Sequence, residues 1–235
     1  MKPKTVAELV GDKLAGEWCM RGGTGFGPFG SENALRSCSS IRVRVDDAAK
    51  NGDVESAVIV LEPAESFAEE ERYLLLQRGE EVAVFFLAHG FSSGIGGFSH
   101  AIEVHKLESK HAWAAKIESG WHDADMGICA ETGSVAEDVV VCTHGAEGFG
   151  CTQVPITRSD YDWSTKTKNG ACGETKTKDL RTGYAMTAKI DGDSLEVRTR
   201  KGASFTHATP PPFAGRSPIS RLVQQMPARR VPLRG

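Results

Sequence analysis

Hydrophobic and polar positions alternate with a period of two along most of this chain, which predicts β-strands. The segment 40–47, SIRVRVDD, alternates in this way, and the apolar run 54–63 follows it across the turn Asn51–Asp53. Asn-Gly between two such runs is a strong hairpin signal. Similar patterns, with turns at 78–79, 108–110 and 191–192, predict about ten short strands in all.

Turns between neighbouring strands favour an antiparallel sandwich or barrel. Since full closure removes exposed strand edges, we expect an all-β fold with an antiparallel β-barrel over residues 5–205. Val6, Leu9, Val10 and Leu14 share one helical face, which predicts a short N-terminal helix over 5–14. The segment 16–23, GEWCMRGG, is predicted to be a strand that runs into a glycine-rich loop.

The C-terminal segment, residues 206–235, differs from the rest in proline content and in charge. It holds six of the ten prolines, and because proline donates no backbone hydrogen bond we expect an extended tail outside the sheet. From Val197 onward there are eight Lys plus Arg and no Asp or Glu, whereas the preceding residues carry 28 − 8 = 20 basic and 31 acidic side chains. A basic end on an acidic body indicates a protein partner that contacts 206–235, but the basic charge is too dilute for a nucleic-acid-binding domain.

Composition narrows the class of protein further. No stretch approaches the roughly 20 apolar residues of a membrane-spanning helix, and the N-terminus MKPKTVAELVGDKL has no apolar core of a secretory signal. We therefore expect no transmembrane segment and a compartment that keeps thiols reduced. None of the six cysteines stands in CxxC spacing, so no structural zinc site is expected.

Two glycine motifs carry weak catalytic signals. Gly90–Gly94 matches G-x-S-x-G, which would make Ser92 a hydrolase nucleophile if a helix followed, but the next residues, IGGFSHAIEV, favour a strand. Gly25–Gly30 matches G-x-G-x-x-G with Asp46 downstream, yet no long helix is predicted after it. A plain loop is the favoured interpretation of both.

The histidines give no clear metal signal. His122–Asp125 is the best local cluster, and His105 shares a strand face with Glu103. Exposed or hydrogen-bonded histidines are commoner than ligands in such patterns, so we expect no metal. The four tryptophans are expected in the core or at a barrel mouth.

Several short motifs in chain order resemble the T-type phycobiliprotein (bilin chromophore) lyase family, whose fold is a calycin barrel. They are LAGEW, IRVRV, FGCTQVPITRSDYDWSTKTKNGAC and YAMTAKIDGDSLEVRTRKG, which together span roughly residues 10–205. The chain departs from the family in two places. CMRGGTGFGPFG replaces a Gln-rich segment, and EEVAVFFLAHG replaces a Pro-Tyr-Arg-x-Arg strand.

The resemblance implies a calycin-like barrel that acts as a bilin-binding chaperone or chromophore lyase on a photosynthetic antenna protein, in the plastid stroma or cytoplasm. A lyase must hold pyrrole N–H groups with carboxylates and pair propionates with cations while a partner thiolate attacks the pigment. The candidates are Asp160 and Asp162 for the pyrroles and acid catalysis, Arg158 for a propionate, Tyr161 and Trp163 for stacking, and Arg42 and Arg44 for similar contacts.

Alternatives stay open at this point. Asp160 and Asp162 would equally well cap a turn, and the arginines would equally well be solvated. The protein would then be a non-catalytic accessory subunit that docks through its basic C-terminal segment, with a Ser92 hydrolase as a third hypothesis. In every case we expect no obligatory cofactor, and a bilin is the one ligand that the resemblance implies.

The spacing of Cys151 and Cys172 excludes a redox CxxC motif, while a hairpin would bring the two residues side by side. We therefore predict that they lie on neighbouring strands and form a disulfide if the compartment is oxidising. Such a loop closure would contribute about 3 kcal/mol.

Overall fold

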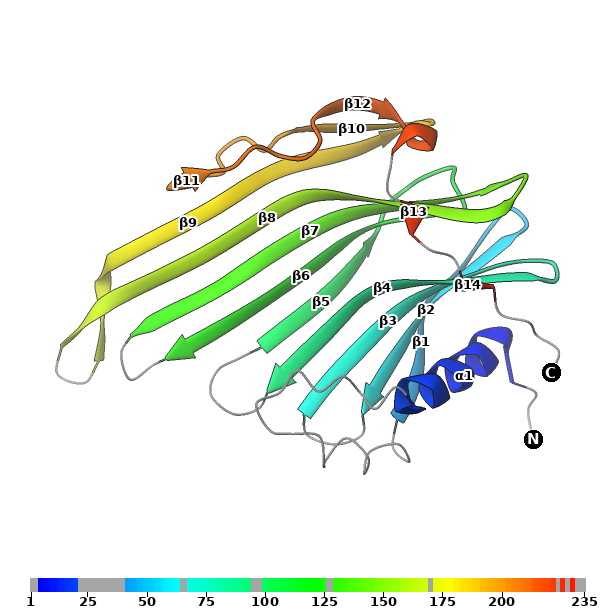
Figure 1. The fold of residues 1–235 in the computed structure, drawn as a ribbon, viewed down its shortest axis with the longest axis horizontal. Helices are drawn as coiled ribbons and strands as arrows, with labels where there is room; N and C mark the ends of the chain where they lie inside the picture. Colours follow the sequence, from blue (N-terminus) through cyan, green and yellow to red (C-terminus); the bar gives the residue numbers. More distant parts are fainter. Residues whose placement is uncertain are drawn as a thin grey trace.

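The residues that the structure describes form a single curved sheet, antiparallel apart from one two-residue parallel pairing near the C-terminus, with one helix on its outer side (Figure 1). The computed structural model describes residues 4–20, 41–63, 67–93, 99–125, 129–168, 171–222, 225–226 and 229–230. Ten strands follow one another in these residues as a meander: β1 Ile41–Asn51, β2 Val54–Pro63, β3 Phe67–Arg78, β4 Glu81–Ser93, β5 Ser99–Lys106, β6 Trp113–Asp125, β7 Ala130–Gly145, β8 Gly148–Lys168, β9 Ala171–Asp191 and β10 Ser194–Thr199.

The predicted all-β, antiparallel class and the predicted turns are confirmed. The turns at 51–53, 78–79 and 191–192 join β1 to β2, β3 to β4 and β9 to β10, and residues 108–110 lie between β5 and β6. In the described residues β1 pairs only with β2, and the strand order ends at β12, so hydrogen bonding does not close the sheet into a barrel.

The N-terminal helix α1 spans Val6–Met20 and is longer than predicted. A capping box starts it: the Thr5 hydroxyl accepts from the Glu8 N–H, and the Glu8 carboxylate accepts from the Thr5 N–H. Val10, Leu14 and Trp18 recur at four-residue spacing and are buried against β1 to β4. The prediction of a strand from residue 16 was therefore wrong, because Trp18 continues the apolar stripe of the helix.

Strand β2 is covered on both faces of the sheet. Its run AVIVL is buried throughout: Val58 and Val60 point to one side of the sheet, and Ile59 and Leu61 point to α1 on the other. A continuous apolar run is what a strand needs when neither face meets water.

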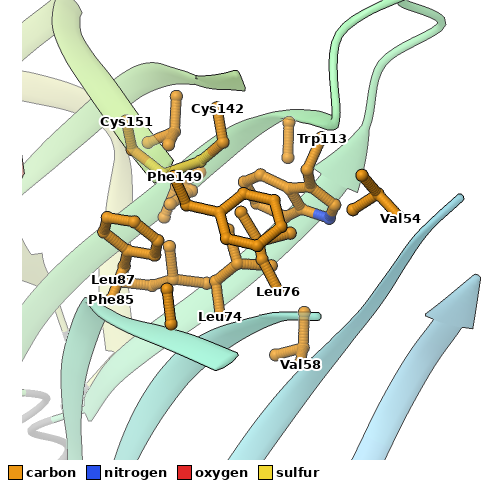
Figure 2. Packing of buried hydrophobic residues seen from close by; sticks show 14 of the residues in the cluster. Val54, Val58, Leu74, Leu76, Phe85, Leu87, Trp113, Cys142, Phe149 and Cys151 are labelled. Carbon is orange, nitrogen blue, oxygen red and sulfur yellow. A yellow bond between two sulfur atoms is a disulfide. The ribbon is translucent and has the colours of Figure 1, made fainter. Parts of the chain in front are cut away.

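The main apolar cluster lies between the two halves of the sheet. It joins residues of β2 to β4, such as Val58 and Phe85, to residues of β6 to β8, such as Trp113 and Cys151 (Figure 2). Strands this far apart in the pairing order can share a core only if the sheet curls around it. We call this inner side the concave face and the opposite side the convex face.

Polar contacts fasten the end of the sheet beside this cluster. The imidazole of His144, on β7, lies 2.8 Å from the Arg78 guanidinium and 2.9 Å from the Glu81 carboxylate, and its ring packs edge-on against Phe149. Glu81 also accepts from the Phe149 N–H. The β3–β4 turn is thereby tied to the β7–β8 turn.

The C-terminal segment is part of the sheet, which corrects the prediction of a tail outside it. It contributes β11 His207–Ala208, β12 Gly215–Pro218, a 3₁₀ turn Ile219–Arg221, β13 Gln225–Met226 and β14 Arg229–Arg230. These strands pair with β9, β10, β8 and β4, respectively. Prolines permit this because the paired stretches are only two to four residues long, and Pro218 ends β12 at the sheet edge.

Two kinds of side-chain contact hold the described part of this segment. Ile219 is buried in an apolar cluster on the convex face of β7 to β10, with Phe213 and Leu222 packed against it. Basic residues find partners in the same chain: Arg216 of this segment pairs with Asp191 at 2.9 Å, and Arg200, which precedes the segment, pairs with Glu137. The charge asymmetry of the sequence is thus partly neutralised within the molecule.

Cys151 forms a disulfide with Cys142, so the predicted Cys151–Cys172 pairing was wrong. Cys142 and Cys151 are directly opposite on β7 and β8, and both are buried. The predicted hairpin of β8 and β9 does exist, but its register sets Cys172 opposite Thr167. Cys129 is also disulfide-bonded. Buried disulfides are typical of oxidising compartments and disagree with the expectation of reduced thiols.

The disulfide is testable by peptide mapping. Combined cleavage after Glu137, Glu147 and Arg158 without reduction should yield residues 138–147 linked to 148–158. Cys142→Ala/Cys151→Ala should lower the free energy of unfolding by roughly 2–3 kcal/mol. A link between 148–158 and the peptide that contains Cys172 would contradict the structure.

Gly183, on β9, is a second testable position. Its φ is +136°, and a Cβ there would lie 1.9 Å from the Arg158 carbonyl oxygen. Gly183→Ala should therefore lower the free energy of unfolding, measured in urea, by about 1–3 kcal/mol or more. Gly145→Ala is the matched control, since nothing lies within 4 Å of its Cβ position. Equal effects of the two variants would contradict the described geometry.

Candidate ligand-binding face

Charged residues of β8 form a row on the concave face, beyond the apolar cluster. Arg158, Asp160 and Asp162 lie at alternate positions of the strand, so their side chains leave the same face about 7 Å apart. Asp138 shows that this is the concave face. It continues the alternation of Val140 and Cys142 along β7, both of which belong to the concave cluster, and it pairs with the Arg158 guanidinium at 2.7 Å. The three candidates are therefore brought together.

The three side chains differ in how their charges are compensated. Arg158 is held by Asp138 and by the carbonyl oxygens of Glu137 and Thr157, so its guanidinium has a fixed direction. Asp162 accepts from the Lys178 ammonium at 2.5 Å. Asp160 is exposed, and within the described part of the chain no side chain is paired with it. Asp160 is thus the carboxylate that a ligand could use.

A tryptophan that the sequence did not single out lies in the same row. Trp121 on β6 is directly opposite Ser134 on β7, and Ser134 is directly opposite Asp160 on β8. Directly paired residues project from one face, so Trp121 and Asp160 flank the small Ser134 side chain, two strand spacings or about 9.6 Å apart. No local motif could reveal this, because the pairing register connects residues that are far apart in sequence.

Tyr161 and Trp163 lie on the convex face, away from this row. The Tyr161 hydroxyl donates to Glu131 at 2.9 Å, and its ring covers Gly133, where a Cβ would lie 2.5 Å from the ring. Burial and the Glu131 carboxylate raise the pKa of Tyr161 to about 12. Because odd and even positions of a strand face opposite sides, Tyr161 and Trp163 do not share a face with Arg158 and Asp160, and their predicted stacking role stays a prediction.

Arg42 and Arg44 also lie on the concave face, but at the other end of the sheet. Arg44 is directly opposite Val60, which belongs to the concave cluster, and it pairs with Glu62 at 2.8 Å and with Asp46. The hydrogen bond to Glu62 keeps the pKa of Arg44 above its usual value despite partial burial. No contact described in the structure joins Arg42 or Arg44 to Arg158.

The other candidates gain no support as sites. Ser92 lies within β4, where its backbone pairs with Ala68 and Ser99, and not at a turn between a strand and a helix. The Gly25–Gly30 motif lies outside the described residues. His122, the first residue of the predicted cluster His122–Asp125, is exposed on β6.

The convex face carries a charged network that sequence reasoning missed. The buried Glu137 carboxylate accepts hydrogen bonds from the Thr157 hydroxyl and the Arg200 guanidinium, and the Lys116 ammonium lies 3.5 Å away. Burial alone would raise the pKa of Glu137, but these partners outweigh it and hold the pKa below its usual value. Because three groups from other parts of the sheet meet at one buried carboxylate, we assign this network a structural role.

The Glu137 network predicts a pH dependence of stability. Since its pKa is lower in the folded than in the unfolded chain, its contribution is complete above the ordinary glutamate value of 4.5 and is lost as the pH falls below it. Glu137→Gln should lower the free energy of unfolding, measured in urea, by about 1–3 kcal/mol at neutral pH and by much less at about pH 3. Glu55→Gln, on an exposed side chain, is the control and should change little at either pH. A pH-independent loss in Glu137→Gln would contradict the assignment.

No helix in the part of the chain that the structure describes has the length and apolar character needed to cross a bilayer. Comparison of the chain with protein-family models, with curated proteins and with solved structures found no match to any of them.

Proposed function

We propose that this protein binds a linear tetrapyrrole (bilin) on the concave face of a calycin-like curved sheet, as a chaperone or chromophore lyase for a photosynthetic antenna protein. The observation that carries the proposal is the row formed by Trp121, Ser134 and Asp160, with Arg158 beside it. An aromatic ring, a carboxylate that accepts no described partner and an oriented guanidinium then lie on one face.

These groups match the parts of a bilin. The Asp160 carboxylate accepts hydrogen bonds from pyrrole N–H groups and so stabilises a protonated, cationic tetrapyrrole, which becomes a neutral adduct when a partner's cysteine thiolate adds to it. Arg158, oriented by Asp138, pairs with a propionate. Trp121 takes the stacking role that the sequence suggested for Tyr161 and Trp163. Asp162 and Lys178 form the outer border of the site.

The alternative, an accessory subunit that docks through residues 206–235, has less support. The described parts of that segment pair with strands of their own sheet, and Arg216 pairs with Asp191 of the same chain. These contacts leave fewer of its groups for a partner than the sequence suggested. The plastid stroma or cytoplasm is kept as the proposed compartment, although a buried disulfide is more typical of an oxidising one.

Titration of the purified protein with phycocyanobilin, followed by absorbance, tests the proposal. The wild type should give a saturable, red-shifted spectrum. Asp160→Asn should weaken binding at least about tenfold, because a hydrogen bond to a charged group contributes about 1.5–3 kcal/mol. Trp121→Phe should alter the spectrum more than Trp163→Phe.

Asp179→Asn is the matched control. Asp179 is directly opposite Trp163 and therefore lies on the convex face of the same hairpin. It should bind the pigment as the wild type does. A wild type without spectral change, or equal affinities of Asp160→Asn and the wild type, would refute the proposed site.

A further inference from the structure

Three side chains that commonly bind metal ions converge on the convex face of β5 and β6. The His105 Nε2 atom lies 3.2 Å from a Glu103 carboxylate oxygen and 3.8 Å from a Glu118 carboxylate oxygen. One ligand atom of each residue lies within 4.8 Å of the other two. This cluster is separate from the concave row proposed to bind a bilin.

Strand register creates the convergence. Glu103 and Glu118 are directly opposite each other across β5 and β6, and His105 is the next residue of β5 on the same face. The sequence showed the pair Glu103 and His105 but indicated no metal, since Glu118 joins them only through strand pairing.

Two carboxylates directly opposite in an antiparallel pair repel each other, so this arrangement needs a cation. Lys116 is next to Glu118 but also contacts Glu137. Three carboxylates, those of Glu103, Glu118 and Glu137, thus face two permanent cations, Lys116 and Arg200. The charged group that the structure describes against Glu103 is His105. The negative charge left over is concentrated at the Glu103 end.

The spacing also suits a small ion. Ligands about 2.1 Å from a tetrahedral ion lie about 3.4 Å from one another, which is close to the two distances at His105. The set of one imidazole and two carboxylates is typical of zinc and neighbouring divalent ions, whereas calcium and magnesium prefer oxygen ligands alone. Small side-chain rotations would complete the geometry, since both glutamates and His105 are at the surface.

We propose that Glu103, His105 and Glu118 form a binding site for Zn²⁺ or a similar first-row divalent ion, with the remaining coordination position open to water. When the ion binds, the Glu118 carboxylate turns partly from the Lys116 ammonium to the ion, and Lys116 keeps its contact with Glu137. The ion would then link β5 to β6 and remove the repulsion between the opposed carboxylates.

Calorimetric titration of the full-length, untagged protein with Zn²⁺ tests this site, and Co²⁺ absorbance reports the ligand geometry. Wild type should bind one ion saturably with a rise in melting temperature. His105→Ala and Glu103→Gln should each weaken binding at least about tenfold, because loss of outer-shell partners alone costs 10–100-fold in metal sites. Without metal, Glu103→Gln should be at least as stable as the wild type. If Glu103 served only as an ion-pair partner of His105, the variant would be less stable.

His207→Ala and Glu55→Gln are the matched controls, since each removes an exposed side chain of the same kind elsewhere. Both should bind Zn²⁺ as the wild type does. The proposal is overturned if the wild type shows no saturable binding, or if His105→Ala and Glu103→Gln bind the ion as tightly as the controls.

Discussion

The apolar contact between the first and second halves of the sheet is the constraint on which the rest of the structure depends. Val58 and Phe85 meet Trp113 and Cys151 in one cluster, and this contact curls a simple meander around its own core. The His144 contacts, the Cys142–Cys151 disulfide and the pairing of β13 and β14 all lie at that end. They fix a curvature that hydrophobic burial produces.

Curvature gives the two faces different chemistry. On the concave face, the apolar floor gives way along β6 to β8 to Trp121, Arg158 and Asp160, on which the proposed bilin site rests. On the convex face, two apolar clusters are covered by α1 and by the segment around Ile219, and the Glu137 network lies on β6 to β8 beside the second of them. The proposed metal site is the exposed end of that network.

The fold class and much of the strand layout could be predicted from the sequence because alternation and Asn-Gly-type turns are local signals. The candidate site was only half predictable. Arg158, Asp160 and Asp162 share a face by strand periodicity alone, but the same periodicity should have separated Tyr161 and Trp163 from them. Trp121 and Glu118 could not be found, since each joins its partners through the register of a neighbouring strand.

The sequence by itself determined the meander of antiparallel strands, its turns and the amphipathic start of the helix, all of which depend on neighbours along the chain. Only the tertiary structure decided that Trp18 extends the helix into the core, that Cys151 pairs with Cys142, and that the proline-rich segment joins the sheet. In each case the deciding contact is between distant parts of the chain. Burial of apolar area and backbone pairing there outweigh the local preference.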